Sequence, residues 1–230
     1  MKKVLLSLAM LTVISTPVLA KSPVANLKIN GDIKPPTCTI NGATQNDVIF
    51  DYGAISPTLI PQSKNYLYPS AAVQNTVTIE CDAKTYLTFV ASDTYDSAEL
   101  ANNTSAQFHL VDKANTENAI GAALFIWSNV TVDDKPAYLS RANDMAITGE
   151  NFNNVLYKGP TNGWTSEQQT GVNKNSLALI SGNIFQATFK QGTKSRTFIL
   201  SKDSLSKKGI DLSNGLDFIG EAVLTFNFGV

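Results

Sequence analysis

Histidine is almost absent from this chain, which has only His109 among its 230 residues. A metal site built from two or three imidazoles is therefore excluded, as is any mechanism that needs two histidines. A catalytic triad of the Ser-His-Asp or Cys-His type would have to use His109. That residue lies in a strand-like pattern and beside no nucleophile-elbow motif. We expect a surface histidine on a strand, with no catalytic role.

Other signatures of chemistry are equally scarce. The glycines are dispersed and form no phosphate-binding loop. Asp133-Asp134 is the only adjacent acidic pair, and its position before Pro136 is typical of a solvated turn. The stretch that begins at Asp93 lacks the alternating oxygen ligands of a calcium loop, and nothing favours paired carboxylates for sugar hydrolysis. The sequence predicts a protein that is not an enzyme and uses no metal or cofactor.

Long apolar runs are also missing, since no stretch reaches the roughly 18 uninterrupted apolar residues of a transmembrane helix. The run Val4–Ile14 is shorter, follows the basic start Met1-Lys2-Lys3 and precedes the small-residue site Val18-Leu19-Ala20. This order is that of a secretory signal peptide. We expect residues 1–20 to be cleaved and residues 21–230 to be soluble and to fold outside the cytosol.

Neither sign of charge is in large excess. Loss of Lys2 and Lys3 with the signal peptide leaves 16 basic and 19 acidic residues, a net charge of about −3. A surface that binds nucleic acid needs a basic excess. We therefore expect no nucleic-acid partner.

Cysteine occurs twice, as Cys38 and Cys81, both in the exported part. An even number in an oxidising compartment is typical of a disulfide. Closing a loop of about 43 residues is worth roughly 3–4 kcal/mol in the chain-entropy model. A redox-active or metal-binding pair is the alternative, but the separation in sequence and the single histidine weigh against it. We predict one structural disulfide.

Helical periodicity is absent beyond about two turns, and short strand-like runs recur between turn residues, which favours an all-β fold. No linker, charge block or repeat divides residues 21–230, so we expect a single domain. The expected strands are Leu27–Ile33, Val48–Tyr52, Val77–Cys81, Tyr86–Ala91, Gln107–Val111, Ala119–Trp127, Ser176–Ile180, Ile184–Lys190, Arg196–Leu200 and Ala222–Phe228, with turns at Asp82–Lys84, Lys113–Asn118 and Gln191–Lys194.

The segment Thr131–Lys174 is the least regular part of the chain. It is polar, rich in Asn and Gly, and carries four scattered aromatic residues, Tyr138, Phe152, Tyr157 and Trp164. Aromatic faces of this kind are common in ligand pockets. Two interpretations stay open: the four form a site for a sugar or peptide, or they are the small core of an insertion.

Several motifs occur in a fixed order along the chain. They are Ile29-Asn30-Gly31-Asp32-Ile33 leading into Cys38, the run Val48–Gly53, the strand Val77–Cys81, and Gly220–Phe228. In this order the chain resembles the fimbrial subunits of bacterial chaperone–usher systems, and most closely the GltF-like family of fimbrial-like periplasmic proteins. The resemblance covers Leu27–Ala91 and Phe185–Val230.

The resemblance implies an immunoglobulin-like (pilin-like) β-sandwich with one disulfide and a long insertion. Such subunits lack their final strand, and the groove is filled by a periplasmic chaperone and then by a neighbour's N-terminal extension. Because Leu27–Ile33 is expected to belong to the sandwich, only Lys21–Asn26 remain as a donor, and we expect a terminal position in any fimbria. The residues implied to line the groove and pair with the chaperone are Ala222, Leu224, Phe226 and Phe228.

The leading hypothesis is a non-catalytic, exported, fimbrial-like protein that acts in adhesion or assembly by pairing strands with a chaperone or with fimbrial subunits. We expect it in the periplasm, in a fimbrium or at the cell surface. The alternative is a self-complete monomeric periplasmic protein that binds a small ligand or glycan through the aromatic residues of the insertion.

Overall fold

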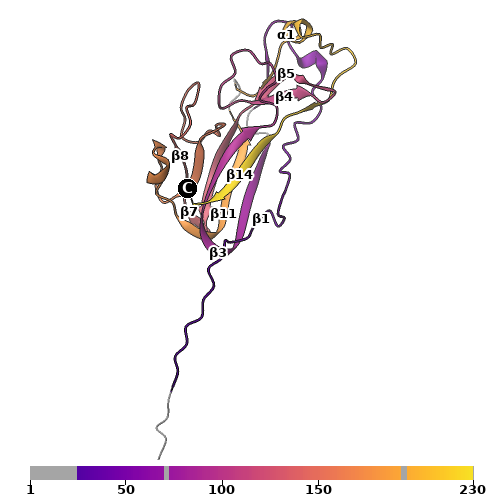
Figure 1. Cartoon of the computed structure of the whole chain (residues 1–230). Helices are drawn as coiled ribbons and strands as arrows, with labels where there is room; N and C mark the ends of the chain where they lie inside the picture. Colours follow the sequence, from indigo (N-terminus) through magenta and orange to yellow (C-terminus); the bar gives the residue numbers. More distant parts are fainter. Residues whose placement is uncertain (1–24, 70–72, 193–195, 230) are drawn as a thin grey trace, which may run out of the picture. The chain divides into compact units, whose positions relative to one another are not determined.

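The computed structural model describes residues 25–69, 73–192 and 196–229 (Figure 1). The predicted signal peptide lies outside these ranges. The chain up to Lys34 is a unit of its own, separate from the compact unit that begins at Pro35, and each is described by itself. Within the described ranges, no helix is both long and apolar enough to cross a membrane.

The fold is all-β and sandwich-like, as predicted, and the described residues include one short α-helix. The strands are β1 Cys38–Ile40, β2 Tyr66–Leu67, β3 Gln74–Asp93, β4 Phe108–Asp112, β5 Asn115–Ala123, β6 Phe125–Val132, β7 Lys135–Pro136, β8 Tyr138–Ala142, β9 Thr161–Thr165, β10 Thr170–Val172, β11 Ser181–Gln191, β12 Phe198–Ile199, β13 Phe218–Ile219 and β14 Ala222–Phe228. The helices are η1 Pro57–Leu59, η2 Lys174–Ser176 and α1 Lys202–Lys207.

Strand β3 organises the larger sheet, whose order is β10-β8-β9-β3-β11-β6-β7. Its first half pairs with β1 and β11, and its second half pairs with β14 and β9. Figure 1 shows β3, β11 and β14 running alongside one another. A smaller sheet has the order β13-β4-β5-β12-β2. Because one long strand carries both sets of partners, the larger sheet curls around its own core.

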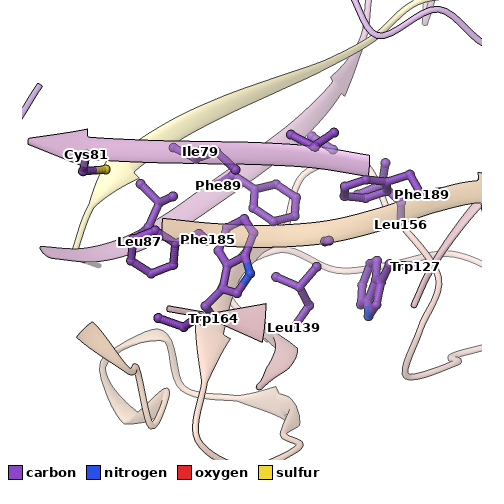
Figure 2. Close-up of a cluster of buried hydrophobic side chains, with 14 of the residues drawn as sticks. Ile79, Cys81, Leu87, Phe89, Trp127, Leu139, Leu156, Trp164, Phe185 and Phe189 are labelled. Carbon is purple, nitrogen blue, oxygen red and sulfur yellow. The ribbon is translucent and has the colours of Figure 1, made fainter. Parts of the chain in front are cut away.

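The main core lies inside this curled sheet. Trp164 on β9 contacts Phe89, Phe185 and Phe226, with ring centroids 5.6, 5.5 and 6.5 Å away. Its indole N–H donates to the carbonyl of Gln186 at 3.2 Å, so the buried ring leaves no polar atom unpaired. Figure 2 shows Trp164, Phe89 and Phe185 converging between the strands. Burying each large apolar side chain is worth about 1.5–3 kcal/mol.

The predicted disulfide is confirmed. Cys38 on β1 and Cys81 on β3 face each other directly in the antiparallel register, with their Cα atoms 4.0 Å apart. Both side chains belong to the main core or pack against it. The disulfide therefore fixes β1 to β3, although the two strands pair over only three residues.

Several sequence-based strands are wrong. Val48–Tyr52 and Ser176–Ile180 are not strands. The first run pairs with no strand of the described residues and lines the groove described below, and the second begins at the last residue of η2. The expected turn at Asp82–Lys84 lies inside β3, which continues through it. The expected hairpin at Gln191–Lys194 does not form, because β11 and β12 belong to different sheets. Apolar alternation marks burial of one face but does not specify the partner strand.

The expected first strand, Leu27–Ile33, is also wrong. Residues 25–34 form no strand, and Leu27 and Ile29 are 97% and 100% exposed. A strand needs a paired edge, and Pro35-Pro36 supplies no backbone N–H with which to continue the ladder of β1. An alternating apolar segment therefore has no strand partner within the described residues.

Replacing Cys38 with Ser should lower the free energy of unfolding by about 2–5 kcal/mol, because the denatured chain regains the entropy of a 43-residue loop. Urea unfolding at neutral pH measures the change. Reduction of the unsubstituted protein is the matched control and should give a similar loss. Two titratable thiols in the undenatured, secreted protein would contradict the prediction.

Candidate functional site

Among the described residues, strand β14 has a sheet partner along one edge only. It runs antiparallel to β3 from Ala222 opposite Asp93 to Phe228 opposite Leu87. Within the described residues it pairs with no other strand. The predicted C-terminal strand is thus confirmed, and its second edge is free.

The backbone groups at that free edge can be assigned. The amide N–H of Thr94 donates to the carbonyl of Glu221, and the amide N–H of Gly229 donates to the carbonyl of Tyr86. Hydrogen-bonded and non-bonded pairs alternate along an antiparallel ladder. The N–H and C=O groups directed at the open edge are therefore those of Ala222, Leu224, Phe226 and Phe228.

The same four residues present their side chains to the core but are only partly covered. Ala222, Leu224 and Phe226 are half-buried and pack against the main core, and Phe228 is 49% exposed. Facing them on β3, Leu87 and Phe89 are fully buried. One face of β14 is therefore built as a core face but lacks its final cover. The residues named from the sequence for strand pairing lie together here.

The opposite wall is formed by β1 and the chain that follows it. Val48 and Phe50 pack against the main core but are only half-buried. Ile40 exchanges backbone hydrogen bonds with Ala43, and this local turn occupies part of the outer edge of β1. Between the walls lies a groove of about 1200 Å³, whose floor includes Val77, Ile79, Leu87, Phe108 and Phe189. A chain that enters the groove would therefore form its backbone hydrogen bonds mainly with β14.

A polar cluster lies where β14 begins. Asp93, at the end of β3, accepts hydrogen bonds from the ring Nδ1 and the backbone N–H of His109, at 2.6 and 2.8 Å. The Nζ of Lys158 contacts Asp96 and lies 3.7 Å from Asp93. His109 is 1% exposed, so the expected surface histidine is wrong. His109 does lie on a strand, β4, as predicted. The strand pattern could not show that the buried carboxylate of Asp93 would hydrogen-bond the imidazole ring.

The charge state of Asp93 follows from its surroundings. Burial by itself would raise the pKa of Asp93, but hydrogen bonds from His109 and from the backbone N–H of Tyr95 outweigh it and hold the pKa below its usual value. The cluster therefore contains a buried, ionised carboxylate.

The cluster offers three metal-ligating side chains, since atoms of Asp93, Asp96 and His109 lie within 4.8 Å of one another. The ammonium group of Lys158 already contacts the carboxylate of Asp96 and lies near that of Asp93. The second ring nitrogen of His109 faces the side-chain amide of Asn103 at 3.1 Å rather than a hydroxyl nucleophile. The geometry is that of an ionic latch joining β3, β4 and the chain at Lys158.

The aromatic residues of the insertion do not form a common site. Trp164 belongs to the main core, and Tyr157 is fully buried in a small cluster with Val155 and Leu124. The guanidinium of Arg141 lies 4.3 Å above the ring of Tyr157. Tyr138 and Phe152 remain 46% and 43% exposed. The segment Thr131–Lys174 supplies β8 and β9 to the larger sheet, and its buried aromatic residues hold it there.

Comparison with known proteins finds no matching family model, curated protein or solved structure.

Replacing Asp93 with Asn should lower the free energy of unfolding at neutral pH by about 3 kcal/mol, because His109 and Lys158 lose a buried anionic partner. Since the folded-state pKa of Asp93 is depressed, its contribution is fully present above the unfolded pKa of about 3.9 and is lost as pH falls through the folded value. The difference between the two proteins should therefore shrink below about pH 4.

Urea unfolding between about pH 2 and pH 7 measures this difference. Asp96→Asn is the matched control, because the Asp96 side chain is 62% exposed and should contribute less. A constant difference between the unsubstituted protein and Asp93→Asn at every pH would contradict the assignment.

Proposed function

We propose that this chain is a non-catalytic, exported, fimbrial-like protein that acts by β-strand pairing with a periplasmic chaperone or with fimbrial subunits. The observation that carries the proposal is β14, whose inward side chains are half-covered and whose outer backbone edge has no strand partner in the described residues. The ordered sequence motifs support the fimbrial part of the proposal.

An extended segment laid beside β14 supplies what that strand lacks. Its backbone pairs with the free groups of Ala222, Leu224, Phe226 and Phe228, and its alternate side chains enter the apolar groove. In this mode of recognition, main-chain hydrogen bonds supply affinity and the side-chain pockets supply specificity. An uncovered edge of this kind is otherwise an aggregation hazard. A chaperone that occupies the groove during export would remove the hazard.

The chain also contains a segment of the complementary kind. In residues 25–34, the apolar side chains of Leu27, Ile29 and Ile33 fall on one face of an extended chain, with Gly31 on the same face. The expected terminal position in a fimbria depended on Leu27–Ile33 being a strand of the sandwich. That strand is absent, so the proposal treats this protein as both an acceptor and a donor of strands.

A glycan-binding function is not favoured. It required Tyr138, Phe152, Tyr157 and Trp164 to share an accessible surface, and Tyr157 and Trp164 are 0% and 1% exposed.

A synthetic peptide with the sequence of residues 25–34 should bind the secreted protein, as measured by the anisotropy of a dye on the peptide. Tryptophan fluorescence of a Trp127→Phe variant gives a second signal, because the remaining ring, that of Trp164, stacks near Phe226 of the groove wall. Leu224→Lys places a charge inside the groove and should weaken binding at least tenfold, about 1.4 kcal/mol. Thr225→Lys, on the outward face of the same strand, should stay within about twofold.

A peptide carrying Ile29→Asp is the control for the donor side and should bind no more tightly than a scrambled peptide. Leu224→Lys should also reduce co-purification with a co-expressed chaperone of a chaperone–usher system. Equal peptide binding by the Leu224→Lys and Thr225→Lys proteins would overturn the assignment of the groove. A protein that binds neither peptide nor chaperone would overturn the proposed function.

A further inference from the structure

We propose that Asn30 is the site at which this chain deamidates spontaneously, and that the isoaspartate formed there ends the ability of residues 25–34 to pair as a strand. Deamidation itself depends only on the chain's own chemistry. Its consequence rests on the proposed function, because it presumes that the segment pairs with a groove.

Asn-Gly is the dipeptide in which this reaction meets the least steric resistance, because glycine has no Cβ to hinder its backbone nitrogen. That nitrogen attacks the side-chain Cγ of the asparagine. The N–Cγ bond forms, the Cγ–Nδ2 bond breaks, and ammonia leaves with the proton that the nitrogen releases through water. Water then opens the succinimide ring to give aspartate or isoaspartate, so an amide becomes a carboxylate with no change of oxidation state.

The chain contains four Asn-Gly pairs, which begin at Asn30, Asn41, Asn162 and Asn214. Because the two reacting residues are the same in each pair, the surrounding structure decides which pair reacts fastest. Ring closure needs a free glycine nitrogen, an asparagine side chain that can rotate toward it, and access for water. The structure removes at least one of these conditions from the last three pairs.

Burial protects Asn162. This residue is 0% exposed, and its Nδ2 donates to the carbonyl of Pro160 at 3.0 Å. The glycine that follows it, Gly163, lies in β9 opposite Thr88 of β3 and Ser140 of β8. Rotation of the side chain toward the Gly163 nitrogen would distort a strand that has neighbours on both sides.

Hydrogen bonds protect Asn41 and Asn214, although both residues are exposed. The amide N–H of Thr78 donates to Oδ1 of Asn41 at 2.9 Å and holds that side chain against β3. The amide N–H of Gly215, whose nitrogen would attack Asn214, donates to the carbonyl of Leu212 at 3.0 Å. The first pair therefore has a fixed side chain, and the second has a nitrogen engaged in a turn.

Asn30 has none of these restraints within its own unit. Residues 25–34 form no strand, and Asn30 is exposed. Neither Asn30 nor Gly31 makes a hydrogen bond among the described residues. A Cβ placed on Gly31 would meet no atom within 4 Å, so the space around the attacking nitrogen is open. Asn30 is therefore the pair that meets all three conditions.

An isoaspartate at position 30 would disrupt the alternation of the segment. The main chain of an isoaspartate runs through the former side chain, which adds one carbon atom between Ile29 and Gly31. Because the side chains of a strand alternate with period two, the added carbon turns Ile33 away from the face that holds Leu27 and Ile29. The carboxylate that remains also places a charge on a segment that has to enter an apolar groove.

Peptide mapping by mass spectrometry, on the secreted protein kept at mildly alkaline pH, follows deamidation at each pair separately. We expect Asn30 to react at least about tenfold faster than each of the other three, a barrier difference of about 1.4 kcal/mol. Reduced protein in concentrated urea is the control for structure, and there the four rates should lie within about threefold of one another. Gly31→Ala hinders the attacking nitrogen and should slow the reaction at Asn30 by about tenfold.

Two altered versions of the dye-labelled 25–34 peptide test the consequence. The version with isoaspartate at position 30 should bind the secreted protein at least about tenfold more weakly than the unmodified peptide. Asn30→Asp is the matched control, because it adds the same charge on the outward face without lengthening the main chain. Binding of that control should stay within about twofold of the unmodified peptide.

The two measurements can fail separately. Deamidation at Asn41 or Asn214 as fast as at Asn30 in the folded protein would overturn the modification site. Equal binding of the isoaspartate and unmodified peptides would overturn the consequence and leave the proposed function standing. An unmodified peptide that does not bind would overturn the proposed function and the consequence together, whereas the modification site would still stand on the mass spectra.

Discussion

Backbone pairing to β3 is the constraint on which the rest of this structure depends. This twenty-residue strand is the partner of β1, β11, β9 and β14, and it holds one of the two cysteines. Strands β1 and β14 pair with it on different halves and with no other strand in the described residues. The groove between them is therefore a consequence of the topology: β3 brings both walls together but leaves one edge of each without a neighbour.

The ionic latch and the disulfide stabilise this arrangement at two different points of β3. Asp93 closes the end of β3 where β14 begins, and Cys81 fixes β1 near the middle of β3. Both act by holding backbone segments that have few pairing partners of their own. The buried charged cluster and the disulfide thus stabilise segments that the mostly apolar core and the sheet hydrogen bonds hold less firmly.

The sequence predicted those features of the fold that a local residue pattern determines by itself. The all-β class, the disulfide and the inward face of β14 followed from alternation and from the cysteine count. Alternation does not show which runs find a partner, so the predicted strands Leu27–Ile33 and Val48–Tyr52 are absent from the structure. Pro35-Pro36 was the signal that could have excluded the first of them. Nothing local marked Asp93, Lys158 and His109 as neighbours, because their contact arises only when β3 and β4 pack.

The central claim is that the outer edge of β14 is open and completed by an added strand. Amide hydrogen exchange, followed residue by residue by NMR, tests it most directly on the Leu224→Lys protein and on the unsubstituted protein, each as a monomer at low concentration. Without peptide, the amides of Val223 and Thr225 should be protected by β3, whereas that of Phe226 should exchange rapidly. Adding the 25–34 peptide should protect Phe226 only in the unsubstituted protein. Protection of Phe226 equal to that of Thr225 in the peptide-free monomer would contradict the account.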